Sequence, residues 1–245
     1  MRHTFRYLVA DPPEAGDELT LSPEDSHHLA RVVRRRPGDE VELTDGAGRL
    51  WPAVVVAAGE RATVRVGAPR QAPAPSPVSL YLGLTDWGRV DLVVEKAAEL
   101  GVREVALMTS ERAGRVPAPP AWERRRERLD RVAAAAARQS GQVWLPRLRG
   151  LVPFGDALAE IPSGEGCLID PRGEAAISAV AGRTGRAALL VGPQAGFSEA
   201  EVARARDTGL AVCGLGPATL RTETAAIAAV TLALAAAGRL SGGMP

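Results

Sequence analysis

The alternation of short apolar runs with longer helical runs after residue 77 constrains the fold most. Five runs have the length and residue types of buried strands, and they read VSLYLGL, EVALM, GCLID, AALLVG and LAVCGL. Helical runs separate them, among them VDLVVEKAAELG, AWERRRERLDRVAAAAARQSG and SEAEVARARDTG. Strands that alternate with helices along a chain form a mostly parallel sheet. We therefore predict an α/β domain over residues 78–245.

The helices of this domain carry their own end signals. Glycine ends three helical runs, at Gly101, Gly141 and Gly209. The third run begins with the spacing of a capping box, Ser198 followed by Glu201. A last helix is predicted from about residue 224 to residue 239, and its sequence AAIAAVTLALAAA is apolar on nearly all faces. Such a helix must be buried all round, and a subunit interface would bury it.

The first 70 residues have a different pattern. The runs TFRYLV, DEVELTDGAGRLWPAVVVAA and RATVRVG alternate in the manner of strands and predict a small β-barrel or sandwich. One helix interrupts them, with Ser22 as N-cap, Pro23 in the first turn and Asp25 as the reciprocal capping acid. The proline-rich stretch 67–77 is typical of an extended connection, so we place a linker at 71–77.

Composition excludes several classes of protein. With 46% hydrophobic residues, the 245-residue chain is globular, and it lacks both a membrane-spanning run and the apolar core of a signal peptide. We therefore expect a cytoplasmic protein. Cys167 and Cys213 lie in apolar runs without metal-ligand spacing, which predicts buried free thiols. His27 and His28 have no third ligand nearby, so no metal site is predicted.

The charge is balanced overall but uneven along the chain. The net charge is +1, yet residues 112–149 hold ten arginines against Glu123, Glu127 and Asp130. A block of this kind suits contact with phosphates, and it equally suits a solvated helix face in an arginine-rich chain. The sequence leaves both interpretations open.

The motifs of several common enzymes are absent. The chain has neither the G-x-G-x-x-G fingerprint of dinucleotide enzymes nor the G-x-x-x-x-G-K-S/T loop of phosphate-binding ones. It also lacks the G-x-S-x-G elbow, and its histidines (His3, His27 and His28) all precede the α/β domain. Hydrolase and redox chemistry are therefore disfavoured.

Two loops rich in glycine and proline follow buried strands of the α/β domain, VGPQAGFSEAE at 191–201 and GLGPATLRTETA at 214–225. Ligands of open α/β sheets bind beyond the carboxyl ends of the strands. Gly192, Gly196 and Gly216 would let main-chain groups approach a flat heterocycle such as adenine. Each loop alone is compatible with an ordinary turn, but their succession at consecutive strand ends favours one shared site.

These motifs carry a resemblance. Together with HHLARVVRRRPGDEVELTDGAG, EKAAELGV, SERA and RQSGQVWLP, in this order over almost the whole chain, the two loops resemble the bacterial 16S ribosomal RNA (uracil-N3)-methyltransferases of the SPOUT superfamily. The resemblance implies a PUA-like β-barrel that binds RNA, followed by a SPOUT α/β domain with a C-terminal trefoil knot. It also implies S-adenosylmethionine bound in the knot, methylation of uridine N3 in 16S rRNA of the small ribosomal subunit, and a homodimer packed through the knot region and C-terminal helix.

The resemblance also implies roles for particular residues. Arg221 would stabilise the substrate, Glu223 would act as a base or as a helix N-terminal charge, and Thr222 or Thr224 would cap the helix. The expected cofactor-binding residues lie in the two loops and at their edges: Leu190, Val191, Gly192, Gly196, Leu215, Gly216, Leu220, Thr222 and Thr224. The expected RNA-binding residues are all arginines: Arg34, Arg35, Arg36, Arg112, Arg124, Arg125 and Arg138.

The sequence departs from the family pattern at several positions. The family loop G-P-E-G-G-F carries Gln194 and Ala195 here, and Asp86 and Trp87 stand where the family has K-G-D. The segment E-Q-S-G-R begins here with Arg138 and ends with Gln142. These changes keep two alternatives open: a divergent relative with the same cofactor site and another substrate, such as a small molecule, or a non-catalytic RNA-binding or assembly factor.

Overall fold

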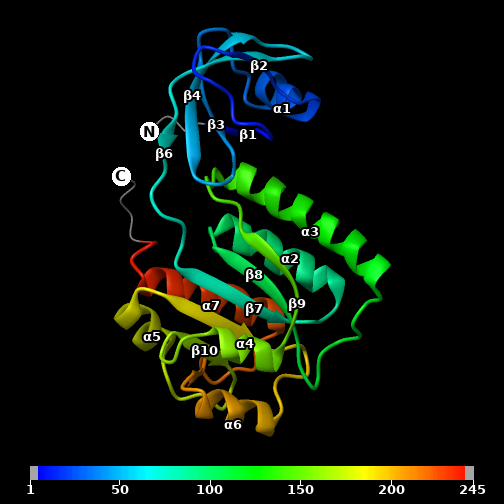
Figure 1. The fold of residues 1–245 in the computed structure, drawn as a ribbon, viewed down its shortest axis with the longest axis vertical. Coiled ribbons are helices and arrows are strands. Elements are labelled where there is room, and N and C mark those ends of the chain that lie inside the picture. The colour runs from blue at the N-terminus through cyan, green and yellow to red at the C-terminus, as the bar shows by residue number, and fades with distance from the viewer. Residues whose placement is uncertain (1–4, 241–245) are drawn as a thin grey trace. The chain divides into compact units, whose positions relative to one another are not determined.

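The computed structural model describes residues 5–240, so His3 lies outside the described residues. Within it the chain divides into two compact units. The first unit comprises the residues up to Ala74 together with Ala137–Leu145. The second comprises Pro75–Ala136 together with the residues from Pro146 onward. Figure 1 follows the chain through both units.

The first unit is built on one curled sheet of six strands in the order β1-β3-β4-β5-β2, with β6 paired to β4. Its core holds alternate residues of the strands, among them Tyr7, Leu43, Trp51 and Val64. The strands are β1 Arg6–Leu8, β2 Glu18–Thr20, β3 Glu40–Thr44, β4 Arg49–Ala57, β5 Thr63–Val66 and β6 Arg70–Gln71. This curled sheet agrees with the small β-barrel predicted for the first residues.

The helix of the first unit has two parts, α1 Pro23–His27 and the π-helical turn η1 His28–Val32. The hydroxyl of Ser22 accepts from the main-chain N–H of Asp25 at 3.1 Å, as an N-cap does. The predicted reciprocal bond is replaced, because the Asp25 carboxylate accepts from the Ser22 hydroxyl at 2.7 Å. Aspartate is one methylene shorter than the glutamate of a capping box, which favours this nearer donor.

Residues 137–145, from the middle of the chain, complete the first unit. The Thr44 hydroxyl donates to the Val143 carbonyl at 3.2 Å, and the Trp144 indole N–H donates to the Pro73 carbonyl at 2.9 Å. A Cβ atom on Gly48 would lie 2.2 Å from the Trp144 ring. The indole therefore packs directly on bare main chain, which fixes residues 137–145 against the sheet.

The second unit contains an all-parallel sheet in the order β12-β10-β11-β7-β8-β9. Its strands are β7 Val78–Gly83, β8 Glu104–Thr109, β9 Arg147–Pro153, β10 Gly166–Ile169, β11 Ala187–Val191 and β12 Ala211–Cys213. The five predicted strands are confirmed. Strand β9 was missed because it lies at the sheet edge and carries Arg149, which pairs with Glu160 at 2.9 Å rather than packing in a core.

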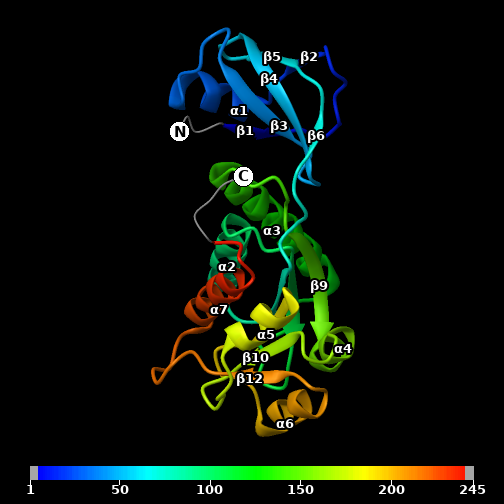
Figure 2. The ribbon, with the colours of Figure 1, turned by 90° about the vertical axis from the view of Figure 1, so that its left-hand side faces the viewer.

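Helices cover both faces of this sheet (Figure 2). Buried residues of α2, α3, α5 and α7 form one cluster against the sheet, and those of α4 and α6 form the cluster on its other face. The helices are α2 Trp87–Glu99, α3 Pro119–Ser140, α4 Phe154–Glu160, α5 Ile177–Thr184, α6 Glu199–Asp207 and α7 Thr222–Ala236. The sequence analysis did not predict the short helices α4 and α5. Helix α7 spans Thr222–Ala236 instead of the predicted 224–239.

The predicted helix ends and thiols are confirmed. Both bonds of the Ser198–Glu201 capping box are present, and the three predicted glycines have positive φ: Gly101, Gly141 and Gly209. Cys167 and Cys213 are free and buried.

Among residues 5–240, no helix combines the length and hydrophobicity needed to cross a membrane. The same residues contain no group of three metal-ligating side chains.

Candidate active site

A cavity of about 320 Å³ opens beyond the carboxyl ends of β10, β11 and β12. Its volume lies in the usual range of small-molecule sites, roughly 300 to 1,000 Å³. It is lined by Arg112, Ile169, Asp170, Pro171, Arg172, Val191, Gly192, Pro193, Gln194, Ala195, Gly196, Phe197, Leu215, Gly216, Ala218, Thr219, Leu220, Thr222 and Ala225. Both glycine-rich loops found in the sequence therefore contribute to one cavity.

The strands that carry these two loops are not neighbours. β10 lies between β11 and β12 in the sheet, although β11 and β12 follow one another along the chain. The two loops thus follow consecutive strands of the chain that are not adjacent in the sheet, because consecutive strands of a crossover fold need not pair. The loop after β10, which begins at Asp170 and continues through Arg172, supplies a third wall of the cavity.

Glycine shapes the cavity wall through backbone conformation. Gly196 has φ 68° and Gly216 has φ 98°, and side chains other than hydrogen rarely allow such values. A Cβ atom on Gly192 would lie 3.2 Å from the Phe197 ring, which is tight. The main chain of both loops is thus exposed to the cavity in conformations that substitution would disturb.

Close main-chain contacts fix the floor of the cavity. A Cβ atom on Gly83, at the end of β7, would lie 2.4 Å from the Pro193 nitrogen. One on Gly173 would lie 2.4 Å from the carbonyl carbon of Cys213. The Asp170 N–H donates to the Cys213 carbonyl at 3.1 Å. The loop after β10 therefore runs directly along the end of β12.

The buried carboxylate of Asp170 forms a two-pronged pair with Arg172. Nε of Arg172 donates to Oδ1 at 2.7 Å and Nη2 donates to Oδ2 at 2.8 Å. These hydrogen bonds hold the pKa of Asp170 below its ordinary value, although burial acts in the opposite direction. Asp170 is only 4% exposed, so the cavity contains a fixed, ionised carboxylate.

Arginines from three elements hold the loop after β11. Nη1 of Arg112 lies 3.3 Å from the Phe197 carbonyl oxygen, and Nη2 of Arg172 lies 3.1 Å from the same oxygen. On the other flank, Nη1 of Arg89 in α2 donates to Oε1 of Gln194 at 2.8 Å. Arg112, expected to bind RNA, therefore contributes to the cavity as well.

Most of the expected cofactor residues gather at the cavity, but two lie outside its lining. Leu190 is fully buried in the cluster on the opposite sheet face, because side chains alternate along β11. Thr224 is exposed on α7. The other seven line the cavity: Val191, Gly192, Gly196, Leu215, Gly216, Leu220 and Thr222. Asp170 and Arg172 were missed, although the polar IDPR after a buried run offered a signal.

Arg221 and Glu223 lie at the start of α7, beside the cavity lining. Arg221 is the N-cap residue and is exposed, with no capping bond from its side chain. The expectation that Thr222 or Thr224 caps the helix is wrong, because the helix already begins at Thr222. Thr222 is instead buried at the cavity wall.

Glu223 is paired with a cation. Its Oε2 lies 3.4 Å from Nε of Arg89, which also lies 3.0 Å from Oδ2 of Asp86. Arg89 thus joins the first turn of α2, the loop at Gln194 and the first turn of α7. The ion pair with Arg89 supports a role for Glu223 as a charge at the start of α7 more directly than a role as a base.

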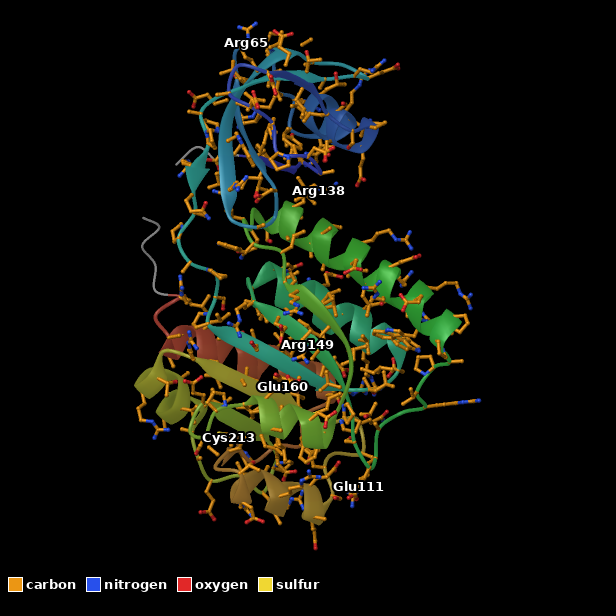
Figure 3. All side chains as sticks on the ribbon, viewed as in Figure 1. Arg65, Glu111, Arg138, Arg149, Glu160 and Cys213 are labelled. Atoms are coloured by element: carbon orange, nitrogen blue, oxygen red, sulfur yellow. The ribbon has the colours of Figure 1, made fainter. Side chains whose placement is uncertain are left out.

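The other arginines expected to bind RNA have different surroundings. Arg34 has φ 52°, and Arg36 is exposed beside it, whereas Arg35 lies over the Phe5 ring at 5.2 Å. On α3, Arg124 is exposed and Arg125 lies over the Trp87 ring at 4.9 Å. Arg138 (Figure 3) lies 3.3 Å from Oδ1 of Asp25. Exposed guanidinium groups are therefore available on both units.

Comparisons with known proteins identify the family of the chain. Residues 72–234 match the family described as RNA methyltransferase domain, and residues 21–66 match the RNA methyltransferase PUA domain. The chain is 30% identical over 238 residues to Ribosomal RNA small subunit methyltransferase E of Mycobacterium bovis, covering 91% of this chain and 88% of the relative.

Solved structures are similar over nearly the whole length. A Legionella pneumophila protein described as a methyltransferase, in complex with SAM, is 26% identical with TM-score 0.81, covering 96% of this chain and 98% of that one. Ribosomal RNA small subunit methyltransferase E from Neisseria gonorrhoeae, bound to S-adenosyl methionine, is 25% identical with TM-score 0.80, covering 95% and 98%. The resemblance found in the sequence is confirmed, and the chain belongs to the RNA methyltransferase family.

Proposed function

We propose that this protein transfers the methyl group of S-adenosylmethionine to N3 of a uridine in the 16S rRNA of the small ribosomal subunit. The observation that carries the proposal is the cavity beyond β10, β11 and β12, with its main-chain walls and buried Asp170. Relatives named as small-subunit rRNA methyltransferases, and similar structures that hold the same cofactor, support it.

The residues of the cavity fit this cofactor. Leu215, Leu220 and Val191 offer apolar contact to a flat adenine ring, and the open main chain at Gly216 offers hydrogen bonds to its edge. The Asp170–Arg172 ion pair lines the same cavity and supplies fixed polar groups for the rest of the molecule. S-adenosylmethionine supplies a methyl group on a positively charged sulfur, ready for transfer to an anionic nitrogen.

The chain itself would position the uracil and stabilise its charge. Uracil N3 must lose its proton before it accepts a methyl group, and the exposed guanidinium of Arg221 beside the cavity would stabilise the resulting anion. Glu223 would act mainly through Arg89, holding the start of α7 against the Gln194 loop. In a second role, the Glu223 carboxylate would accept the proton that uracil N3 loses.

We also propose that the enzyme is a homodimer that packs through α7 and a knotted C-terminal region. Helix α7 buries one side in its own chain, but Leu232 is 50% exposed, and Thr224 and Ala235 are exposed on the same side. A helix without charges beyond its first turn does not normally leave such a face in water. A second copy would cover it, and Leu232→Glu should then convert the dimer to monomers in analytical ultracentrifugation.

The first unit and the arginines of α3 are proposed to grip the RNA. Phosphate contacts made by exposed arginines position a protein on RNA without reading its sequence. Arg34, Arg36 and Arg124 are exposed and suited to this task, whereas Arg138 is engaged with Asp25. Action on the small ribosomal subunit would place the protein in the cytoplasm.

The direct test is methylation of small ribosomal subunits from a strain that lacks the endogenous enzyme. The expected product is one new N3-methyluridine in 16S rRNA, identified by mass spectrometry after nuclease digestion. Cofactor binding without this product would instead indicate the divergent relative with another substrate. If the cofactor does not bind at all, the result would favour the interpretation of the protein as a non-catalytic RNA-binding or assembly factor.

A further inference from the structure

A buried carboxylate connects two of the loops that line the cavity beyond the parallel sheet. Glu201 lies in the first turn of α6 and is 4% exposed. Its Oε2 accepts from the main-chain N–H of Ser198 at 2.9 Å, which is its half of the capping box. Its Oε1 accepts from the main-chain N–H of Glu111, also at 2.9 Å. Glu111 (Figure 3) lies 90 residues earlier, in the loop after β8, so this second bond has no part in capping the helix.

The residue that follows Glu111 makes the reverse connection. Nη1 of Arg112 lies 3.3 Å from the carbonyl oxygens of both Ala195 and Phe197, in the loop after β11. One loop therefore donates a main-chain N–H to the acid of α6 and donates a guanidinium N–H to the loop that leads into α6. Because Arg112 is the next residue along the chain, the bond at Glu111 fixes the main chain from which the guanidinium extends.

The Glu201 carboxylate is well suited to hold a loop. A buried carboxylate has lost its hydration and needs hydrogen-bond donors in return. Both of its oxygens have main-chain donors, and these come from two different segments. A main-chain N–H cannot turn away without moving the chain, so the carboxylate keeps both segments in place together.

Arg112 differs from the other charged residues of the cavity lining, which are Asp170 and Arg172. Those two residues form an ion pair with each other, so their charges compensate. Arg112 is exposed and forms no ion pair with any residue in the range 5–240. A guanidinium in this setting suits an anionic oxygen, and the backbone of RNA carries a phosphate at every nucleotide.

We propose that Glu201 is a positioning residue for RNA binding, which holds the loop of Glu111 so that the guanidinium of Arg112 contacts a phosphate of the RNA at the cavity. The inference rests on the proposed function in one respect, that the substrate is RNA. It deepens that function, because it gives an acid of a helix cap a task in substrate binding and gives Arg112 a defined ligand group.

The capping box offers a matched pair of variants. Glu201→Ala and Ser198→Ala each remove one half of the box, and only Glu201→Ala also releases the N–H of Glu111. Both should lower the thermal midpoint. Glu201→Gln fills the same space as glutamate and serves as a second variant should Glu201→Ala fail to fold, because its NH2 group cannot accept from a main-chain N–H. Arg112→Gln removes the guanidinium itself.

Co-sedimentation of each variant with small ribosomal subunits, without cofactor, measures the affinity. Arg112→Gln should weaken binding by about three- to tenfold, the usual range for one charged contact. Glu201→Ala should weaken it to a similar degree, although loss of an acid would by itself strengthen binding to a polyanion. Each should also reduce the slope of log K against log salt concentration by about 0.7 to 0.9, as expected for one phosphate contact. Ser198→Ala should leave affinity and slope unchanged.

A double variant tests whether Glu201 acts through Arg112. Glu201→Ala combined with Arg112→Gln should bind no more weakly than Arg112→Gln alone, because the two residues serve one contact. Multiplied losses in the double variant, or an equal loss in Ser198→Ala, would reduce Glu201 to a structural cap and overturn the proposal.

Calorimetry with S-adenosylmethionine separates the phosphate from the other anionic group at hand, the carboxylate of the cofactor. Arg112→Gln should leave cofactor affinity nearly unchanged. Weaker cofactor binding together with unchanged subunit affinity would contradict the phosphate contact. Failure of the proposed function would appear differently, as a wild-type chain that binds subunits and shows these variant effects but methylates none.

Discussion

The two cavities of this protein are built in opposite ways. The cavity beyond the parallel sheet has walls of main chain, at Gly192, Gly196 and Gly216, whereas a second cavity, in the first unit, has walls of side chains, among them Trp51 and Arg49. A main-chain wall tolerates changes of side chain but not an added Cβ atom where chain segments touch. A wall made of side chains is instead altered by any substitution of those side chains. Gln194 and Ala195 are both exposed, so neither departure from the family loop places a side chain where two chain segments touch.

The largest expected effect comes from Gly173→Ala. The new Cβ would lie 2.4 Å from the carbonyl carbon of Cys213, where neither segment has room to move. We expect a loss of about 3 kcal/mol of unfolding free energy, in the range of the most damaging single substitutions. Gly182→Ala in α5 is the matched control, since its nearest atom would be 4.0 Å away, and it should be neutral or slightly stabilising. Urea unfolding measures both, and similar midpoints would refute the close contact.

Asp170→Asn should follow in size. It removes a buried carboxylate that binds Arg172 through two hydrogen bonds. We expect the free energy of unfolding to fall by about 2 kcal/mol at pH 7, reduced by solvent screening because the Arg172 side chain is half-exposed. Because folding lowers the pKa of Asp170, its contribution is present above the ordinary aspartate pKa of 3.8 and is lost as the pH falls through the lower folded pKa.

The stability difference between wild type and Asp170→Asn should therefore be constant near neutral pH and shrink below about pH 3.8. Unfolding by urea at several pH values measures it. A difference that grows in acid would have the wrong sign and would remove Asp170 from the account of the cavity.

Arg221→Ala should affect turnover rather than the fold. Its side chain is exposed at the N-cap of α7 and makes no capping bond, so stability should change little. We expect turnover to fall tenfold or more, equivalent to about 1.4 kcal/mol or greater of transition-state stabilisation, with nearly unchanged cofactor affinity. Methyl transfer to small subunits and calorimetry with the cofactor separate the two quantities. Unchanged turnover would exclude Arg221 from the mechanism.

Gln194→Glu should have the smallest effect and sharpen the comparison. The residue is exposed at the cavity edge and already binds Arg89 at 2.8 Å, so a carboxylate of the same length fits there. A negative charge near a cationic ligand should raise cofactor affinity by about threefold or less, since exposed charges are screened. Gln139→Glu makes the same charge change on exposed α3, and an equal gain there would show a general effect of net charge.

The sequence predicts best what depends on local pattern. Five of the six strands of the parallel sheet, the glycine helix ends and the Ser198 capping box were predicted because each has a short-range signature. The cavity lining at 191–197 and 215–222 was found for the same reason, since glycine loops after apolar runs are visible in one dimension.

What the sequence missed depends on the order of elements in space. The place of β10 between β11 and β12, which brings Asp170 to the cavity, is a property of sheet order and has no local signature. The return of residues 137–145 to the first unit and the pairing of Glu223 with Arg89 are likewise long-range contacts. The cavity around Trp51 draws on three separate stretches, so no motif marks it.

Titration calorimetry with S-adenosylmethionine tests the central claim most directly. The wild-type chain should bind one molecule per chain, and Ala218→Trp should abolish the heat at an unchanged thermal midpoint, because Ala218 lines the cavity and is exposed. Absence of binding by the wild type, or undiminished binding by the blocked variant, would contradict a cofactor site beyond β10, β11 and β12.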